Sequence, residues 1–267
     1  MRRRPGASGS ALHRKREQTM YLKTEGIVLR ETEYGEADRL LTVLTRDYGR
    51  MTLRARGVKR GRSPLKSACQ LLAYSEFTVF DYRARATINE AVAIEQFRQL
   101  REDIELLALG SYFAQVAELL AQEDCPNPRL LSLLLNSLYI LCRRSRPQPL
   151  VKAAFELKAA CLAGFEPDLS GCALCGAPSP ERFNVSHGVL QCAGCASPQL
   201  DGLRLPVSAG TLAAMRHIVR GDEKKLFSFS LSDEALGELS GVTETFLTTQ
   251  LEHGFYTLDF YKSLFLT

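Results

Sequence analysis

Four of the eight cysteines in the chain form two closely spaced pairs. Two residues separate Cys172 from Cys175, the same spacing recurs between Cys192 and Cys195, and sixteen residues lie between the pairs. Two intervening residues let both thiolates of a pair face one tetrahedral centre, and a gap of this length is typical of zinc sites. Four thiolates would fill the shell of the ion and leave no position for a reacting water. The spacing therefore predicts one structural Zn²⁺ rather than a hydrolytic metal centre.

The same cysteines leave other interpretations open. Two disulfides or four metal-free thiols are compatible with the spacing, and a tetrahedral sulfur shell also accepts iron. His187 lies between the two pairs, where it is expected in a loop and as a reserve ligand only.

Basic residues are concentrated toward the N-terminus. Residues 1–66 contain 17 Lys and Arg against 7 Asp and Glu, a net charge of +10, and the remaining residues lower the total to +4. This polarity suits a polyanionic partner, because Lys and Arg contacts with phosphates release condensed counterions. A solvated basic face without a partner is the alternative interpretation.

Within the basic region, Arg or Thr alternates with apolar residues over 50–56, so a strand there presents its arginines on one face. Further cations follow in a glycine-containing segment and near residue 85. The cations predicted to contact nucleic acid are Arg39, Arg50, Arg54, Arg56, Lys59, Arg60, Arg62, Lys66, Arg83 and Arg85. The tyrosines that are candidates for base stacking are Tyr34, Tyr48, Tyr74 and Tyr82.

The elements that must position these residues change in character near residue 95. Before it, β-rich runs separated by turn residues occur at 26–31, 40–45, 50–58, 71–81 and 87–94. Five short strands predict a small barrel of the oligonucleotide-binding (OB) type, although strand count alone does not distinguish it from an SH3-like barrel.

After residue 95 the apolar residues follow a helical period. Helices are expected at 106–120, 130–143, from about 150, and at 207–220 and 233–252, with Ser232 as the N-cap of the last. The predicted class is α+β multidomain. Its parts are a flexible basic extension (1–19), an OB barrel (20–94) and a helical domain (95–267) with the zinc-binding insertion at about 170–200.

Several function classes find no support in the sequence. Uninterrupted apolar stretches are too short for a membrane span, and residues 1–19 lack the apolar core of a signal peptide. The segment 57–63 is one residue short of a phosphate-binding loop, and 63–66 matches a serine-nucleophile motif without its partner motifs. A hydrolase or nuclease is thus disfavoured, and we expect a cytoplasmic, nucleoid-associated binding protein rather than an enzyme.

Two stretches resemble a known family. Residues 26–63 (GIVLRETEYGEADRLLTVLTRDYGRMTLRARGVKRGRS) and 155–176 (FELKAACLAGFEPDLSGCALCG) are similar to the opening and the pre-knuckle helix of the bacterial RecO recombination mediators. The similarity extends from about Tyr21 to the C-terminus.

The resemblance implies binding of single- and double-stranded DNA and annealing of complementary strands. It also implies cooperation with RecR to load RecA onto DNA coated by single-stranded-DNA-binding protein (SSB). Similar proteins bind the acidic, Phe-ending tail of SSB. The cations expected to receive that tail are Arg143, Arg144, Lys152 and Lys158. The alternative is a zinc-containing accessory factor that binds RNA or protein in transcription or translation.

Overall fold

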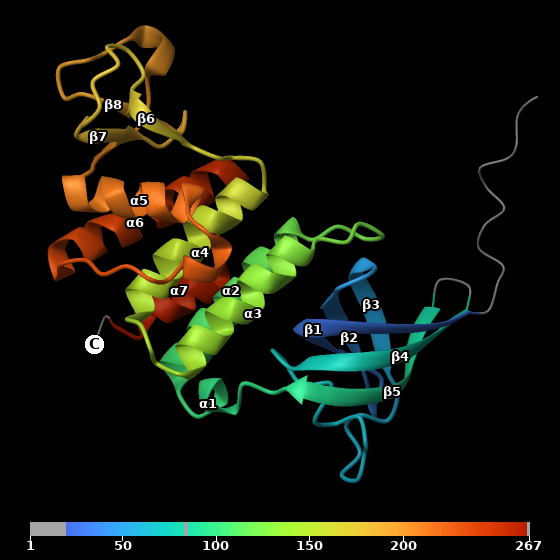
Figure 1. The fold of residues 1–267 in the computed structure, drawn as a ribbon. Coiled ribbons are helices and arrows are strands. Elements are labelled where there is room, and N and C mark those ends of the chain that lie inside the picture. The colour runs from blue at the N-terminus through green and yellow to red at the C-terminus, as the bar shows by residue number, and fades with distance from the viewer. Residues whose placement is uncertain (1–19, 83–84, 266–267) are drawn as a thin grey trace, which may run out of the picture. The chain divides into compact units, whose positions relative to one another are not determined.

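The chain folds into two units, the first ending at Gln96 and the second starting at Phe97. They are seen in a computed structural model that describes residues 20–82 and 85–265 (Figure 1). The predicted basic extension over residues 1–19 and the predicted DNA contact Arg83 lie outside the described residues, as does the side chain of Arg85.

The first unit is a closed β-barrel. Its strands are β1 (Met20–Tyr34), β2 (Asp38–Thr45), β3 (Gly49–Ala55), β4 (Tyr74–Tyr82) and β5 (Arg85–Glu95). They close in the order β1-β2-β3-β5-β4, with β3 and β5 parallel and the other neighbours antiparallel. This five-stranded closed barrel confirms the OB-type fold predicted for the region.

Strand β1 is much longer than the predicted run 26–31, because it pairs with a different neighbouring strand along each half. Its first half pairs with β4 and its second half with β2, and Gly26 lies where the two pairings overlap. A Cβ at Gly26 would come within 2.7 Å of Val43 Cγ1, so only glycine allows the strand to bend inward there. The residues just before Gly26 are polar, so a hydrophobicity pattern does not predict the first half of the strand.

The barrel core consists of inward-facing residues at alternate positions of the strands. Leu41, Val43, Leu53, Phe77 and Val79 are completely buried and pack in one cluster. Each such side chain stabilises the fold by about 1.5–3 kcal/mol relative to an exposed position. The alternate residues of β3 therefore face outward, as the sequence pattern predicted.

The second unit is built on seven helices among the residues that the structure describes. They are α1 (Arg98–Arg101), α2 (Ile104–Leu120), α3 (Pro128–Cys142), α4 (Gln148–Leu162), α5 (Ala209–Arg220), α6 (Asp233–Leu251) and α7 (Tyr256–Ser263). Helix α4 is central and packs against α3, α5 and α6 (Figure 1). It is buried all round from Leu150 to Ala160, and Phe155 stacks on Phe113 of α2 with ring centroids 4.1 Å apart. Five of these helices confirm the predicted ones, including the N-cap Ser232.

A small sheet is inserted between α4 and α5. It contains β6 (Asp168–Cys172), β8 (Val189–Gln191), β7 (Arg182–Asn184) and β9 (Arg204–Pro206), in that order. Phe183 of β7 is completely buried and packs edge-on against Phe246 of α6. This sheet and its loops carry the four paired cysteines, as expected from their spacing. Among the described helices, none combines the length and apolar content needed to cross a membrane.

Candidate nucleic-acid interface and metal centre

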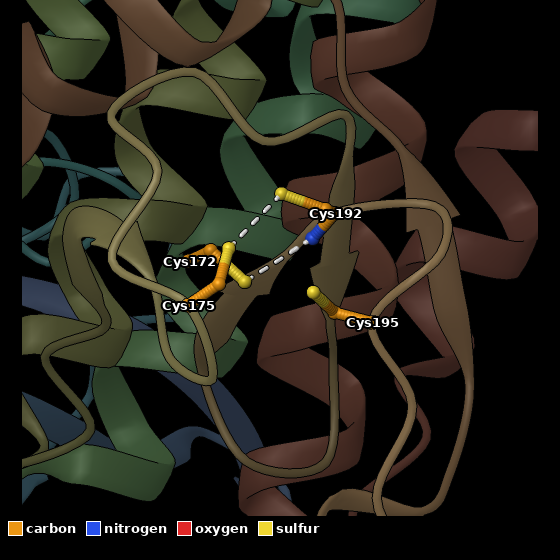
Figure 2. A group of neighbouring side chains, drawn as sticks. All are labelled: Cys172, Cys175, Cys192 and Cys195. Atoms are coloured by element: carbon orange, nitrogen blue, oxygen red, sulfur yellow. Dashed lines mark hydrogen bonds between the residues drawn. The ribbon is translucent and has the colours of Figure 1, made fainter.

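The four cysteines of the two pairs converge at one point of the inserted sheet (Figure 2). All four sulfur atoms lie within 4.8 Å of one another, and the Sγ atoms of Cys175 and Cys192 are 3.7 Å apart. Cys172 is buried at the end of β6, Cys192 follows β8, and Cys175 is exposed. The pairs meet because β6 and β8 are parallel neighbours, with Cys172 in register with Leu190.

Tight turns hold each pair in place. The N–H of Gly176 donates to the carbonyl of Cys172 at 2.9 Å, and the N–H of Cys195 donates to that of Cys192 at 3.1 Å. Gly176 has a φ of +74°, a conformation that glycine adopts without strain. The turns therefore explain why a short two-residue spacing directs both sulfur atoms of a pair to the same side.

The environment of Cys172 favours a thiolate. Burial raises the pKa of its thiol, but hydrogen bonds from the backbone N–H groups of Cys175, Cys192 and Leu174 outweigh burial and lower the pKa to about 6. The Cys192 pKa is raised to about 12, first by its hydrogen bond with Cys175 and then by burial. The thiol of Cys172 ionises readily, whereas the pKa values of Cys192 and Cys195 are raised, because negative charges crowd this space without a cation.

These four residues fit a metal ion. A tetrahedral centre with metal–sulfur distances of about 2.3 Å has ligand sulfurs about 3.8 Å apart. The measured separation of 3.7 Å between Cys175 and Cys192 agrees with that value. His187 lies elsewhere, with its Nε2 atom 3.1 Å from the carbonyl of Asp201. The cluster can hold a metal with cysteine ligands alone.

Three of the cations predicted to contact nucleic acid pair with carboxylates of the barrel itself. Arg54 donates to Asp38 through Nε at 2.9 Å and through a terminal nitrogen at 2.6 Å. The Asp38 carboxylate also accepts the N–H of Gly57 at 2.7 Å. These hydrogen bonds, from Gly57 and then from Arg54, lower the pKa of Asp38. Arg54 therefore helps to fix the segment after β3.

The other two internal pairs join strands near the same segment. Arg39 on β2 pairs with Glu31 on β1, and Lys59 pairs with Glu33 on β1 at 2.7 Å. Glu31 also accepts the backbone N–H of Leu71 at 2.5 Å. These carboxylates hold the segment between β3 and β4 against the barrel.

Two of the remaining predicted cations that the structure describes lie on a groove. Arg56 and Arg60 are exposed and line a groove of about 780 Å³ between the segment after β3 and the outer face of the barrel. Arg62 and Lys66 are exposed farther along that segment, and Arg50 is half-buried on β3. The opposite wall of the groove contains Tyr21, Phe80, Thr87, Ile88 and Asn89.

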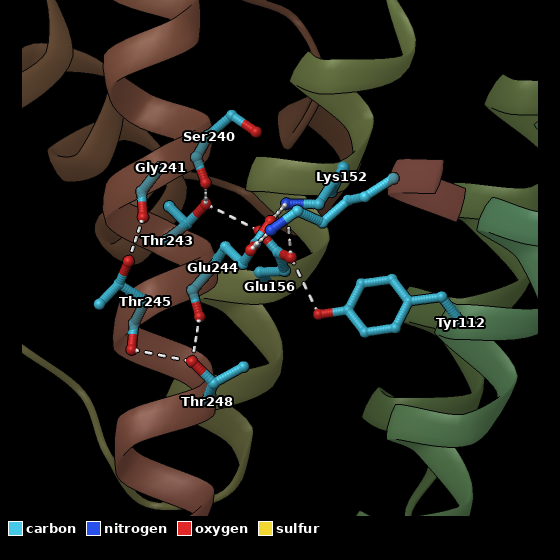
Figure 3. Close-up of polar contacts among 10 residues, drawn as sticks. Tyr112, Lys152, Glu156, Ser240, Gly241, Thr243, Glu244, Thr245 and Thr248 are labelled. Atoms are coloured by element: carbon cyan, nitrogen blue, oxygen red, sulfur yellow. Dashed lines mark hydrogen bonds and ion pairs between the residues drawn. The ribbon is translucent and has the colours of Figure 1, made fainter. Parts of the chain in front are cut away.

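The cations predicted to receive an acidic tail differ in exposure. Lys152 is 4% exposed and pairs with Glu156 at 2.9 Å and Glu244 at 2.8 Å (Figure 3). Lys158 is buried and its Nζ lies 3.3 Å from the carbonyl of Val219, near the C-terminal end of α5. Neither amine faces solvent. The amine of Lys152 neutralises two carboxylates, and that of Lys158 lies at the negative end of the α5 dipole.

Arg143 and Arg144, in contrast, are exposed at the end of α3. The guanidinium of Arg143 lies 4.9 Å from the ring centroid of Tyr139, and Arg144 pairs with Asp103 at 2.5 Å. Tyr139 is itself 47% exposed, so this corner presents a cation beside an accessible aromatic ring.

Comparison with known families covers both units. Residues 20–97 match the profile described as Recombination protein O N terminal, and residues 101–259 match Recombination protein O C terminal. The chain belongs to the RecO family. RecO proteins are DNA repair proteins, and the first profile ends within one residue of the boundary between the two structural units.

Curated RecO proteins resemble the chain over almost its whole length. The DNA repair protein RecO of Acetivibrio thermocellus is 35% identical over 246 residues, which cover 91% of this chain and 97% of that protein. The RecO protein of Symbiobacterium thermophilum is 30% identical over 246 residues, covering 90% and 96%. That of Alkaliphilus metalliredigens is 29% identical over 248 residues, covering 92% of this chain and all of that protein. The predicted family is confirmed.

The aromatic residues at the groove of this RecO family member differ from those proposed from sequence. Tyr74 is buried with its hydroxyl donating to Glu25, Tyr48 is half-buried, and Tyr34 lies beneath the guanidinium of Arg54. Tyr82 falls where side chains are not described. Tyr21 was missed. It is exposed beside buried Leu22, but the polar residues from Lys23 to Glu25 give no apolar alternation from which its outward direction could be predicted.

Proposed function

We propose that this RecO family protein binds single- and double-stranded DNA through its barrel and anneals complementary strands. With RecR, it helps to load RecA onto single-stranded DNA coated by SSB. The observation that carries the proposal is the basic groove on a five-stranded barrel of a DNA repair family. Barrels of this type bind nucleic acid chains across one face.

The mechanism relies on charge rather than on bond making. Arg56 and Arg60 in the groove, with Arg62 and Lys66 beyond it, neutralise phosphates and so reduce repulsion between two strands. Phosphate contacts leave the base edges free to pair and carry no sequence information. Annealing should therefore show little sequence preference.

The test is annealing of complementary SSB-coated oligonucleotides without added nucleotide. We expect acceleration by the parent protein and its loss in the double variant Arg56→Glu/Arg60→Glu. These positions are preferred to Arg54, because a reversed charge at Arg54 would face Asp38 and disturb the fold. For single-stranded DNA, the slope of log K against log salt should fall by about 0.7 for each lost contact.

The matched control is Lys224→Glu/Lys225→Glu, which makes the same change of net charge at exposed lysines of the helical unit. It should retain annealing. Equal loss in both variants would show that net charge, and not the groove, drives the reaction. A parent protein that binds RNA in preference to DNA of equal sequence would contradict the proposal and favour an accessory role in transcription or translation.

We propose Zn²⁺ as the ion of the four-cysteine cluster. Four thiolates in a tetrahedral arrangement suit zinc, and a saturated shell supplies folding energy rather than catalysis. Here Cys172, Cys175, Cys192 and Cys195 hold the ion and tie the two turns together.

We further propose that the acidic SSB tail binds near Arg143 and Arg144 at the end of α3. The exposed guanidinium of Arg143 would pair with a carboxylate, and the neighbouring ring of Tyr139 offers an apolar contact for the terminal Phe. In a titration with the tail peptide, Arg143→Glu should abolish binding. Retained affinity would assign the tail to another surface. Charge reversal at the buried Lys152 would only disturb folding.

A further inference from the structure

One wall of the basic groove carries an aromatic pair, an exposed Tyr21 and a half-buried Phe80, that phosphate binding does not use. Tyr21 on β1 is 65% exposed, and its ring centroid lies 5.2 Å from that of Phe80 on β4. The two residues are directly opposite each other in the antiparallel ladder, so their rings share one face of the barrel. An exposed Tyr on a strand whose next residue is buried presents a flat π surface toward the groove.

The strand register extends this wall toward the cations. Phe80 is opposite Thr87 on β5, and Thr87 pairs in register with Arg54 on β3. A single row across the barrel thus leads from the two aromatic rings to the guanidinium of Arg54. Asn89 lies two residues beyond Thr87 on the same face and is exposed, so its amide is available as a donor and an acceptor.

The facing wall provides positive charge, and the carboxylate that lines the groove competes little with a phosphate for it. Arg56 and Arg60 line it, and the groove also contains the carboxylate of Asp38. Both oxygens of Asp38 already accept hydrogen bonds, one from Gly57 and the other from Arg54. The groove volume of about 780 Å³ lies within the range of small-ligand sites, about 300–1,000 Å³.

We infer that this groove seats an unpaired nucleobase of a single DNA strand, stacked on the exposed ring of Tyr21, with Arg56 and Arg60 on the flanking phosphates. The ring of Phe80, tilted by 57° to that of Tyr21, supports Tyr21 from the side. This inference rests on the proposed function and adds to it a preference for unpaired bases. A flat aromatic ligand with an adjoining anion matches the juxtaposed rings and guanidinium groups. Bases in a duplex are stacked on one another and cannot enter, so the groove distinguishes single strands from duplexes without reading sequence.

The test uses the absence of tryptophan from the chain. A Tyr21→Trp variant of the full-length protein has one tryptophan in the groove, and its fluorescence is recorded with oligothymidylate and with an abasic oligonucleotide of equal length. Both have the same phosphates, but only the first has bases. We expect quenching by oligothymidylate and little by the abasic strand. Tyr256→Trp, at a helical-unit tyrosine of similar exposure (68%), should not distinguish the two.

Affinities provide the second measurement. Tyr21→Ala should weaken binding of oligothymidylate by about 5- to 150-fold, the range expected for one stacked base, and leave binding of the abasic strand and of blunt duplex unchanged. Tyr21→Phe should restore the affinity. Arg56→Glu/Arg60→Glu should weaken the abasic strand and oligothymidylate alike, because both contact the arginines through phosphates.

Two outcomes overturn the inference in different ways. If the protein binds both strands equally and Tyr21→Ala changes neither, DNA binding stands and the base site does not exist. If the folded parent protein binds neither strand nor the duplex, the proposed function fails together with the inference.

Discussion

Lys59 has two competing anions, the carboxylate of Glu33 in the protein and, in the proposed function, a DNA phosphate. Glu33 is 70% exposed and its pKa is lowered by the hydrogen bond from Lys59 and by the charge of that lysine. An exposed pair of this kind is weak, and a phosphate must replace it on binding.

Replacing Glu33 with Gln should therefore strengthen DNA binding by about two- to fivefold at low salt. The measurement is fluorescence anisotropy of a labelled single strand over a salt series. The matched control is Glu223→Gln, which removes the partner of Arg129 in the helical unit and changes the net charge equally. If both variants gain the same affinity, net charge explains the effect and Glu33 has no specific role.

Individual site residues were predictable from sequence when the local spacing alone defined their geometry. The four cysteines were found in this way, since each turn lies within a few residues of chain. The partners of the cations were not predictable, because Arg54 meets Asp38 and Lys59 meets Glu33 through strand pairing. Sequence shows a positive charge but does not show whether a distant carboxylate already compensates it.

Helices α4 and α6 are joined by a buried polar network that the sequence pattern did not reveal. Glu156 is completely buried and accepts hydrogen bonds from Tyr112 and Thr243, each at 2.9 Å, besides its pair with Lys152 (Figure 3). Lys152 also pairs with Glu244. Burial raises the pKa of Glu156, an effect that the charge of Lys152 opposes.

Truncating Lys152 to Ala should destabilise the helical unit by about 3–5 kcal/mol, because it leaves the completely buried carboxylate of Glu156 without its cation, whereas Glu244 keeps Lys262. Denaturant unfolding followed by circular dichroism measures the change. Lys262→Ala removes the exposed partner of the same Glu244 and should cost less than about 1 kcal/mol. The double variant Lys152→Met/Glu156→Gln should recover part of the loss. Equal effects at Lys152 and Lys262 would contradict a buried charge cluster.

The predictable elements were those with a long hydrophobic period. Helices α2 and α3 present many buried apolar residues at helical spacing, and their prediction was correct to within about two residues. Helix α7 was missed because it buries only Leu258 and Tyr261 while Tyr256 and Phe260 stay exposed. The strands β7, β8 and β9 have three residues each, too few for an alternating pattern to be visible.

At the scale of the molecule, the sheet with the four-cysteine cluster is connected to the helical unit by hydrogen bonds. Arg216 of α5 donates to the carbonyls of Leu169, Ser170 and Pro178, which flank the first cysteine pair. Gln250 of α6 donates to the carbonyl of Val185 at 2.8 Å. Loss of the ion should therefore weaken the helical unit, whereas the barrel has its own closed sheet and core.

Removal of the metal should consequently lower the stability of the helical unit and leave DNA binding by the barrel unchanged. We expect about one zinc per chain by elemental analysis, and chelation should lower the melting temperature of the helical unit and raise amide exchange over 168–206. Oligonucleotide binding by the barrel should persist. Cys195→Ser should reproduce the chelated state, while Cys125→Ser, at an exposed cysteine outside the cluster, should not.

A folded chain that contains no zinc and is insensitive to chelator would instead indicate disulfides or free thiols. Parallel loss of DNA binding would mean that the metal-bearing unit takes part in the nucleic-acid site.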